Sequence, residues 1–133
     1  MNVKTWTNGE YFLVDDYDRI ADNIREICNK FSYEVPVFPE LNFYYIVYVE
    51  DMNILSDFVN TVARKLWGKD LPNGFENIRR FVNGSVMWDS DELNALENDL
   101  QIIFNEGSAF DELKIRVDSH GNVRTANGNE RIV

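Results

Sequence analysis

The sequence predicts a mainly α fold in one domain over residues 1–133, with three repeated amphipathic helices, one short helix and a small C-terminal β hairpin. The main observation is a phrase that occurs three times, at residues 15–24, 50–59 and 91–100. Each copy has an acidic pair, an apolar residue, an Asn or Asp, any residue, and then Ile or Leu. Because internal repeats define how a chain is built, this phrase sets the expected architecture.

The apolar positions of the three copies align without gaps. They recur at i, i+3, i+7 and i+10, which is one face of an α-helix. The aligned residues are Tyr17, Ile20, Ile24 and Ile27, then Met52, Leu55, Val59 and Val62, then Leu93, Leu96, Leu100 and Ile103. This ladder predicts helices near 15–31, 50–66 and 90–104.

The acidic pair that opens each phrase fits the start of a helix. A helix N-terminus has free N–H groups and a partial positive charge, which carboxylates cap and neutralise. Clusters such as Asp15, Asp16 and Asp18 do not have the spacing of a calcium-binding EF-hand loop. We therefore expect caps at these positions and no metal site.

The segments between the helices carry other signals. Asn8-Gly9 and Asn83-Gly84 predict tight turns before the first and third helices. Pro36 and Pro39 predict a turn before a short buried extended segment at 43–49.

Two further elements follow from spacing. The apolar residues Phe75, Ile78 and Phe81 predict a short helix over 75–82. The alternation that begins at Leu113 predicts the hairpin near 112–126, with residues 119–122 as its turn.

Composition limits the classes of partner. The formal net charge is −10 and the sequence pI is about 4.4, which disfavours contact with a nucleic-acid backbone or an anionic membrane. The longest apolar run, 43–49, is far shorter than the roughly 20 residues of a membrane span. The N-terminus lacks the apolar stretch of a signal peptide, and one cysteine allows no intramolecular disulfide. We therefore expect synthesis in the cytoplasm.

No pattern in the chain predicts catalysis. His120 is the only histidine and falls in the predicted hairpin turn, whereas Cys28 falls on the apolar face of the first helix. Glycine-rich phosphate loops, CxxC pairs and HExxH are absent from the sequence. We therefore expect a protein that is not an enzyme, with no catalytic residue and no cofactor.

Six residues are candidates for interaction. Tryptophans are enriched at the centres of protein interfaces, and one polar position recurs directly after the first apolar residue of each repeat. These candidates are Trp6, Trp67 and Trp88, and Asp18, Asn53 and Asn94. For the polar position, one interpretation is an exposed side chain with a local hydrogen bond. The other is a hydrogen bond between repeats or between subunits.

The first copy resembles a known type of segment. It consists of Trp6-Thr7-Asn8-Gly9, then Val14-Asp15-Asp16-Tyr17-Asp18-Arg19-Ile20, then Asp22-Asn23-Ile24. Over residues 6–27 this is similar to a segment of virion structural proteins from phages and prophages of Gram-positive bacteria. Such segments occur in tail, baseplate and fibre-attachment proteins. The resemblance implies helices that pack between copies of an oligomer.

These observations lead to one main functional hypothesis and two alternatives. The main hypothesis is a structural or assembly protein of a phage or prophage virion, which forms a homo-oligomer or packs on other virion proteins. The first alternative is an acidic inhibitor that mimics DNA and binds a basic nucleic-acid enzyme. The second is a bacterial immunity or adaptor protein with a single partner.

Overall fold

The computed structural model describes residues 1–41 and 47–110, and this part of the chain contains three helices. They are α1 (Val14–Phe31), α2 (Val49–Trp67) and α3 (Ser90–Glu106). The mainly helical class is therefore confirmed, as are the three predicted helices. The predicted hairpin near 112–126 and His120 lie outside the described residues.

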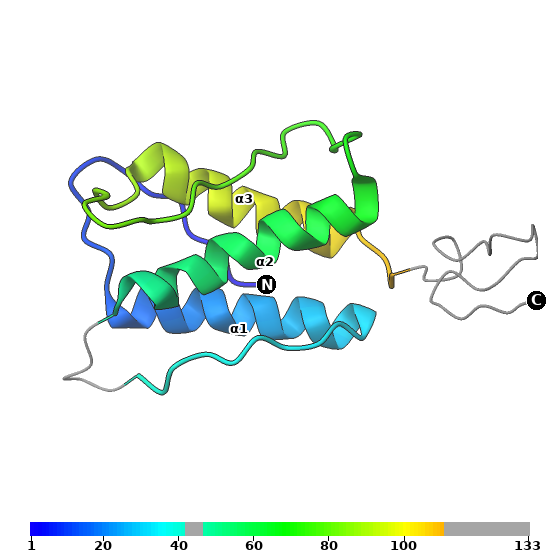
Figure 1. Cartoon of the computed structure of the whole chain (residues 1–133), viewed down its shortest axis with the longest axis horizontal. Coiled ribbons are helices and arrows are strands. Elements are labelled where there is room, and N and C mark those ends of the chain that lie inside the picture. Colours follow the sequence, from blue (N-terminus) through cyan, green and yellow to red (C-terminus); the bar gives the residue numbers. More distant parts are fainter. Residues whose placement is uncertain (42–46, 111–133) are drawn as a thin grey trace, which may run out of the picture.

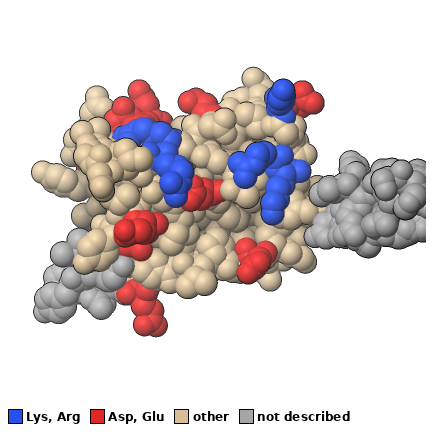
Figure 2. Space-filling model, in the orientation of Figure 1, with Lys and Arg blue, Asp and Glu red and all other residues tan. Residues whose placement is uncertain are grey.

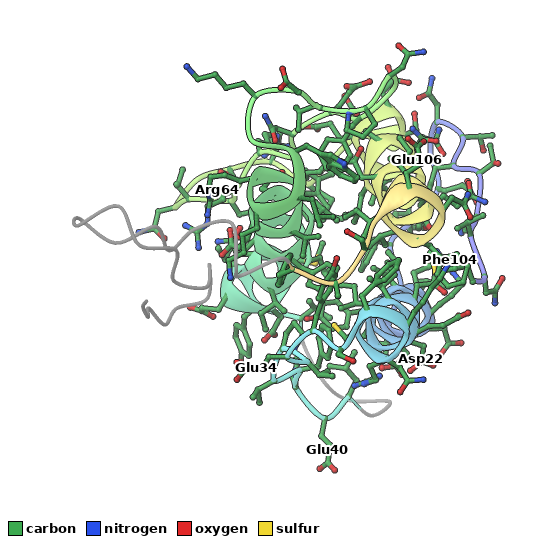
Figure 3. All side chains as sticks on the ribbon, turned by 90° about the vertical axis from the view of Figure 1, so that its right-hand side faces the viewer. Asp22, Glu34, Glu40, Arg64, Phe104 and Glu106 are labelled. Atoms are coloured by element: carbon green, nitrogen blue, oxygen red, sulfur yellow. The ribbon has the colours of Figure 1, made fainter. Side chains whose placement is uncertain are left out.

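The three helices run in the same direction (Figure 1). Where α1 and α2 begin, the Tyr17 hydroxyl donates to the Asp51 carbonyl oxygen at 2.7 Å. Where α1 and α3 end, Lys30 Nζ donates to the Phe104 carbonyl oxygen at 2.7 Å. Viewed from their C-terminal ends, the helices stand at the corners of a triangle (Figure 3). Parallel helices require a segment that runs back along the bundle before each new helix begins.

Three extended segments run along the bundle, and we call them arms. Arm 1 is residues 1–8, arm 2 is residues 33–41 and arm 3 is residues 74–88. Arm 1 passes along α1 and α3, arm 2 along α1, and arm 3 along α2 and α3 (Figure 1). The repeating unit of the fold is thus an arm followed by a helix.

The core forms along the middle of the triangle. All twelve apolar residues of the aligned ladder are buried there. The arms add further large side chains from outside the helices, namely Trp6, Tyr33, Phe75, Ile78, Phe81 and Trp88. Full burial of one such side chain contributes about 1.5–3 kcal/mol to folding. The arms are therefore part of the core rather than loops laid over it.

The acidic pairs cap the helices in the same way in all three copies. In each, the second acid of the pair accepts a hydrogen bond from the backbone N–H three residues before it. The bonds are Leu13 N to Asp16 Oδ2 (2.9 Å), Tyr48 N to Asp51 Oδ2 (2.8 Å) and Asp89 N to Glu92 Oε1 (3.0 Å). The predicted capping role is therefore confirmed for the second acid of each pair.

The predicted tight turns are confirmed as well. Gly9 has φ +87° and Gly84 has φ +83°, a backbone conformation that favours glycine. A third turn of this kind lies at Asn73-Gly74, where Gly74 has φ +89°. Asn8-Gly9 ends arm 1 and Asn73-Gly74 begins arm 3, whereas Asn83-Gly84 is a turn within arm 3.

The short helix predicted over 75–82 is wrong, because this stretch is extended. The N–H groups of Glu76, Ile78 and Phe81 donate to side chains of α2 and α3 instead of to carbonyls four residues earlier. Apolar residues that are three positions apart fit an extended segment bound by side chains of neighbouring helices as well as they fit a helix. Within residues 1–41 and 47–110 the arms form no β-strand.

The segment before α2 differs in part from its prediction. Of the expected buried stretch 43–49, residues 42–46 lie outside the described part of the chain. Tyr48 precedes the first turn of α2 and Val49 begins it, and both side chains are exposed. Among the described helices, none combines the length and apolar character needed to cross a membrane.

Candidate functional site

The amides of Asn53 and Asn94, at the same position of the repeat, hold two arms with the same geometry. Asn94 Oδ1 accepts from Trp6 N at 2.7 Å, and its Nδ2 donates to the Trp6 carbonyl oxygen at 3.0 Å. Asn53 makes the same pair of bonds to Phe81, at 2.7 and 3.0 Å. In these two copies the repeated polar position therefore forms hydrogen bonds between repeats within one chain.

Asp18 occupies this position in α1 and behaves differently. Its side chain is exposed, and it forms no ion pair within the described part of the chain. An ionised carboxylate has no N–H to donate to a backbone carbonyl, so Asp18 lacks the chemistry of an amide clamp.

Two more amides make the same type of contact and were not among the sequence candidates. Asn23 exchanges two hydrogen bonds with the backbone of Asn2, at 2.9 and 2.8 Å. Asn60 does so with Ile78, at 2.9 and 2.7 Å. The sequence held one signal for Asn60. It lies two helical turns beyond Asn53, and therefore on the same face of α2.

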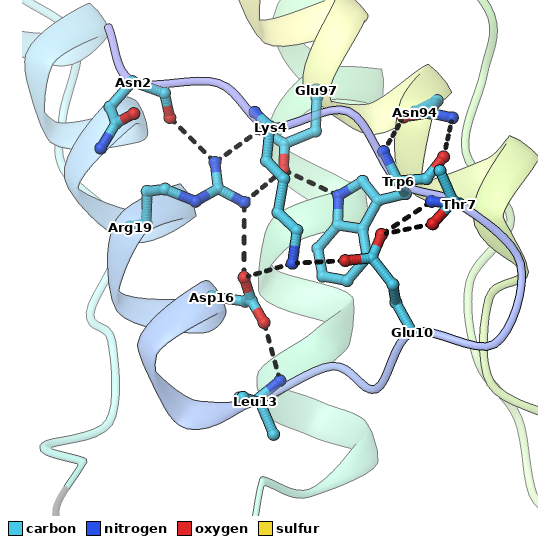
Figure 4. A network of polar contacts seen from close by, with 10 residues as sticks. All are labelled: Asn2, Lys4, Trp6, Thr7, Glu10, Leu13, Asp16, Arg19, Asn94 and Glu97. Carbon is cyan, nitrogen blue, oxygen red and sulfur yellow. Dashed lines mark hydrogen bonds and ion pairs between the residues drawn. The ribbon is translucent and has the colours of Figure 1, made fainter.

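A buried ion pair joins α1 to α3 beneath arm 1 (Figure 4). Arg19 Nη1 lies 2.8 Å from Glu97 Oε1, and the Trp6 indole N–H donates to Glu97 Oε2 at 3.0 Å. Glu97 is only 3% exposed, so these donors replace the water that its charge has lost. The hydrogen bonds that Arg19 donates to Glu97 raise the pKa of Arg19.

Lys4 closes this network on its outer side (Figure 4). Its Nζ lies 3.4 Å from carboxylate oxygens of Asp16 and Glu10, and 3.9 Å from the centre of the Trp6 ring. The cation thus contacts two carboxylates and one aromatic face. Because each of these carboxylates already accepts from nitrogen donors, the network is suited to holding arm 1 in place.

The three tryptophans do not form one surface. Trp6 is 3% exposed and Trp88 is 2% exposed, so both fill the core of this chain. Trp88 packs edge-on against Phe81, with ring centres 4.8 Å apart. Trp67 is half-buried and packs on Phe75 at 6.0 Å. Their packing within the chain accounts for these rings without a partner.

An apolar groove of about 610 Å³ lies where α1 and α2 begin. We call this surface the apolar end. It is lined by Tyr11, Phe12, Leu13, Val14, Val47, Tyr48, Val49, Met52, Phe81, Ser85 and Met87. Tyr11 is 83% exposed and Tyr48 is 56% exposed, and the exposed Val86 lies between the lining residues Ser85 and Met87 in sequence.

The sequence reasoning missed this surface, although one signal was present. Leu13 and Tyr48 are the residues immediately before α1 and α2. Ser, Thr, Asp and Asn are strongly preferred at such positions, and leucine is among the disfavoured residues. A large apolar residue before two of the three repeats therefore indicates a role outside the helix.

Asp99, Cys28 and Tyr33 are buried groups whose pKa values are strongly raised. Asp99 is fully buried under arm 3, where its Oδ1 accepts from Glu76 N at 3.0 Å and its Oδ2 has no hydrogen-bond partner among the described residues. Burial raises the pKa of Asp99 to about 8 and that of Cys28 to about 11. At pH 7 the Cys28 side chain is thus a thiol in the core, where the helical pattern placed it.

Within the described residues, no group of three or more His, Cys, Asp or Glu side chains is arranged to hold a metal ion. No known protein family, curated protein sequence or solved structure matches the chain.

Proposed function

We propose that this chain is a non-enzymatic assembly protein that docks on another protein through its apolar end. The observation that carries this proposal is the gathering of exposed Tyr11, Leu13, Tyr48, Val49 and Met87 around one groove. Single exposed apolar residues are common on soluble proteins, whereas a contiguous group of them marks an interaction surface. By contrast, the side chains of the Glu97 network and of the asparagine contacts already bind the arms of this chain.

Mimicry of DNA has less support from the arrangement of the acids. A mimic needs a field of carboxylates that are free to meet a basic enzyme. Here Asp16, Asp51 and Glu92 cap helices, and Arg79 and Arg80 pair with acids of α3 and α2. On the face shown in Figure 2, basic side chains lie among acidic ones.

The virion is the setting that we propose for this assembly role. Its support is the similarity of residues 6–27 to segments of virion structural proteins. In the structure these residues form part of arm 1, its turn and most of α1, which bear several groove-lining residues. A protein beside this chain in a phage tail or baseplate would then cover the apolar end.

Affinity purification from cells that express the chain tests this function. We expect the tagged protein to retain a partner that a Tyr11→Ser, Met87→Ser double variant, which changes two exposed groove-lining residues, retains at least tenfold less. The control is Val37→Ser, which removes a side chain that is 90% exposed on arm 2 and does not line the groove. Retention should be repeated with the purified partner. Equal retention by the double variant and the wild-type protein would contradict docking through the apolar end.

A further inference from the structure

The charges around the apolar end indicate what kind of segment binds there. Resting on the function proposed above, we propose that the groove takes a basic amphipathic segment of a different protein, with apolar side chains flanked by Lys and Arg. Two observations support this proposal: the apolar lining of the groove and the acidic residues beside it.

The groove itself suits apolar side chains of mixed shape. Tyr11 offers an exposed aromatic face with a polar hydroxyl group, and tyrosine is favoured as an anchor in interfaces. Met52 lies buried in the lining and Met87 is exposed beside it. Methionine side chains are flexible and adapt to different apolar partners. An amphipathic segment would insert its apolar face here, as in other helix-in-groove contacts.

Exposed carboxylates stand next to groove-lining residues of α1 and α2, and we call them the acidic border; Asp15 and Asp18 also line a second hollow beside Arg19. Asp15 follows the lining residue Val14, Asp18 lies one turn further along α1, and Glu50 follows the lining residue Val49. All three side chains are exposed, and none forms an ion pair with a residue of the described part of the chain. Carboxylates at the border of an apolar contact attract and orient a basic partner.

The same charges argue against two other occupants. In a symmetric contact between two copies, each acidic border would face its own equivalent and repel it. An anionic membrane would be repelled as well, because the chain has a formal net charge of −10. The basic segment of another protein is the occupant that meets both the apolar lining and the acidic border.

The probe for this inference is a fluorescent synthetic helical peptide made of Leu and Lys with all Leu on one face. We expect fluorescence anisotropy to show that the peptide binds the full chain. Because salt screens the charges, the affinity should weaken roughly fivefold or more between about 50 and about 300 mM NaCl. A peptide with Glu in place of Lys, and one of the same composition with Leu and Lys shuffled, should bind at least tenfold more weakly.

Paired variants locate the contact. Tyr11→Ser with Met87→Ser should weaken binding of the Leu and Lys peptide about tenfold, because about 1.4 kcal/mol of apolar contact is lost. Asp18→Asn with Glu50→Gln should weaken it several-fold and reduce its dependence on salt. The controls are Val37→Ser, and Asp70→Asn with Glu106→Gln at the other end of the bundle, which should change the affinity less than twofold. Circular dichroism checks that each variant is folded.

Several outcomes would overturn the inference. They are no binding of the Leu and Lys peptide, equal binding of the Glu peptide, or equal loss in the controls. Self-association of the wild-type chain that Tyr11→Ser with Met87→Ser abolishes would assign the surface to a second copy instead. If the peptide does not bind but affinity purification still yields a partner that depends on Tyr11 and Met87, the inference fails and the proposed function stands. If the peptide binds as expected but no such partner exists, the proposed function fails.

Discussion

Replacing Glu97 with alanine should lower the free energy of unfolding by about 3–5 kcal/mol, the usual cost of removing one partner of a buried ion pair. The substitution leaves the charge of Arg19 without its main partner and the Trp6 indole N–H without an acceptor. Since domains are stable by only about 5–15 kcal/mol, this is a large part of the total. Urea unfolding at pH 7, followed by circular dichroism, measures it.

Two variants show whether the loss comes from the pair. Glu106→Ala, at the exposed end of the same helix, should change the stability by less than about 0.5 kcal/mol. Glu97→Gln keeps the shape and an acceptor oxygen, so it should cost less than Glu97→Ala. A loss under about 1 kcal/mol for Glu97→Ala would show that the network in Figure 4 does not hold arm 1 to the helices.

The stability of the wild-type protein should fall as the pH rises from 5.5 to 8, because of Asp99. Its folded-state pKa of about 8 is above its ordinary value near 3.8. The folded state therefore holds a proton that the unfolded state has released, and stability is lost between these two values, by up to about 1.4 kcal/mol for each pH unit. The loss should level off above pH 8, where both states are ionised.

Asp99→Asn isolates this effect from other titrating groups. The amide is neutral at every pH, and its oxygen still accepts from Glu76 N, so we expect the pH dependence to flatten. From pH 5.5 to 8, the free energy of unfolding of Asp99→Asn, measured with urea, should rise by a few kcal/mol relative to that of the wild-type protein. The exposed Asp70→Asn should leave the wild-type slope unchanged. Parallel curves for Asp99→Asn and the wild-type protein would show that Asp99 is ionised in the folded state.

The helices could be predicted because their signals are local. An apolar stripe with an acidic start specifies a helix whatever lies around it, and the ladder from Tyr17 to Ile103 became the core. The capping role of Asp16, Asp51 and Glu92 is local for the same reason. Each of these acids binds a backbone group three residues away.

The arms could not be predicted, because side chains far away in the sequence hold them. Ile78 and Phe81 are extended since Asn60 and Asn53 take the backbone bonds that a helix would have used. The lengths of the connections between the helices did indicate that the helices run in the same direction. A helix of 18 residues is about 27 Å long, and about nine extended residues cover that distance. The connections before α2 and α3 are long enough for this.

The candidate site was predicted only in part. Asn53 and Asn94 shared a position in the repeat, and the structure gives them a shared contact. Trp6 and Trp88 were predicted as interaction residues from their residue type alone. Residue type does not distinguish a ring in the core from one in an interface. The apolar end brings together the turn of arm 1, the starts of two helices and the turn of arm 3, which no local pattern links.

The central claim is that asparagine side chains hold extended arms against parallel helices. Amide hydrogen exchange followed by NMR tests it most directly. We expect the N–H groups of Trp6, Ile78 and Phe81 to exchange at least roughly 100-fold more slowly than in an unstructured peptide, although they lie in no helix or strand. Asn53→Ala should release Phe81 selectively, and Asn60→Ala should release Ile78. Exchange of these amides at the rate of an unstructured peptide in the wild-type protein would contradict the claim.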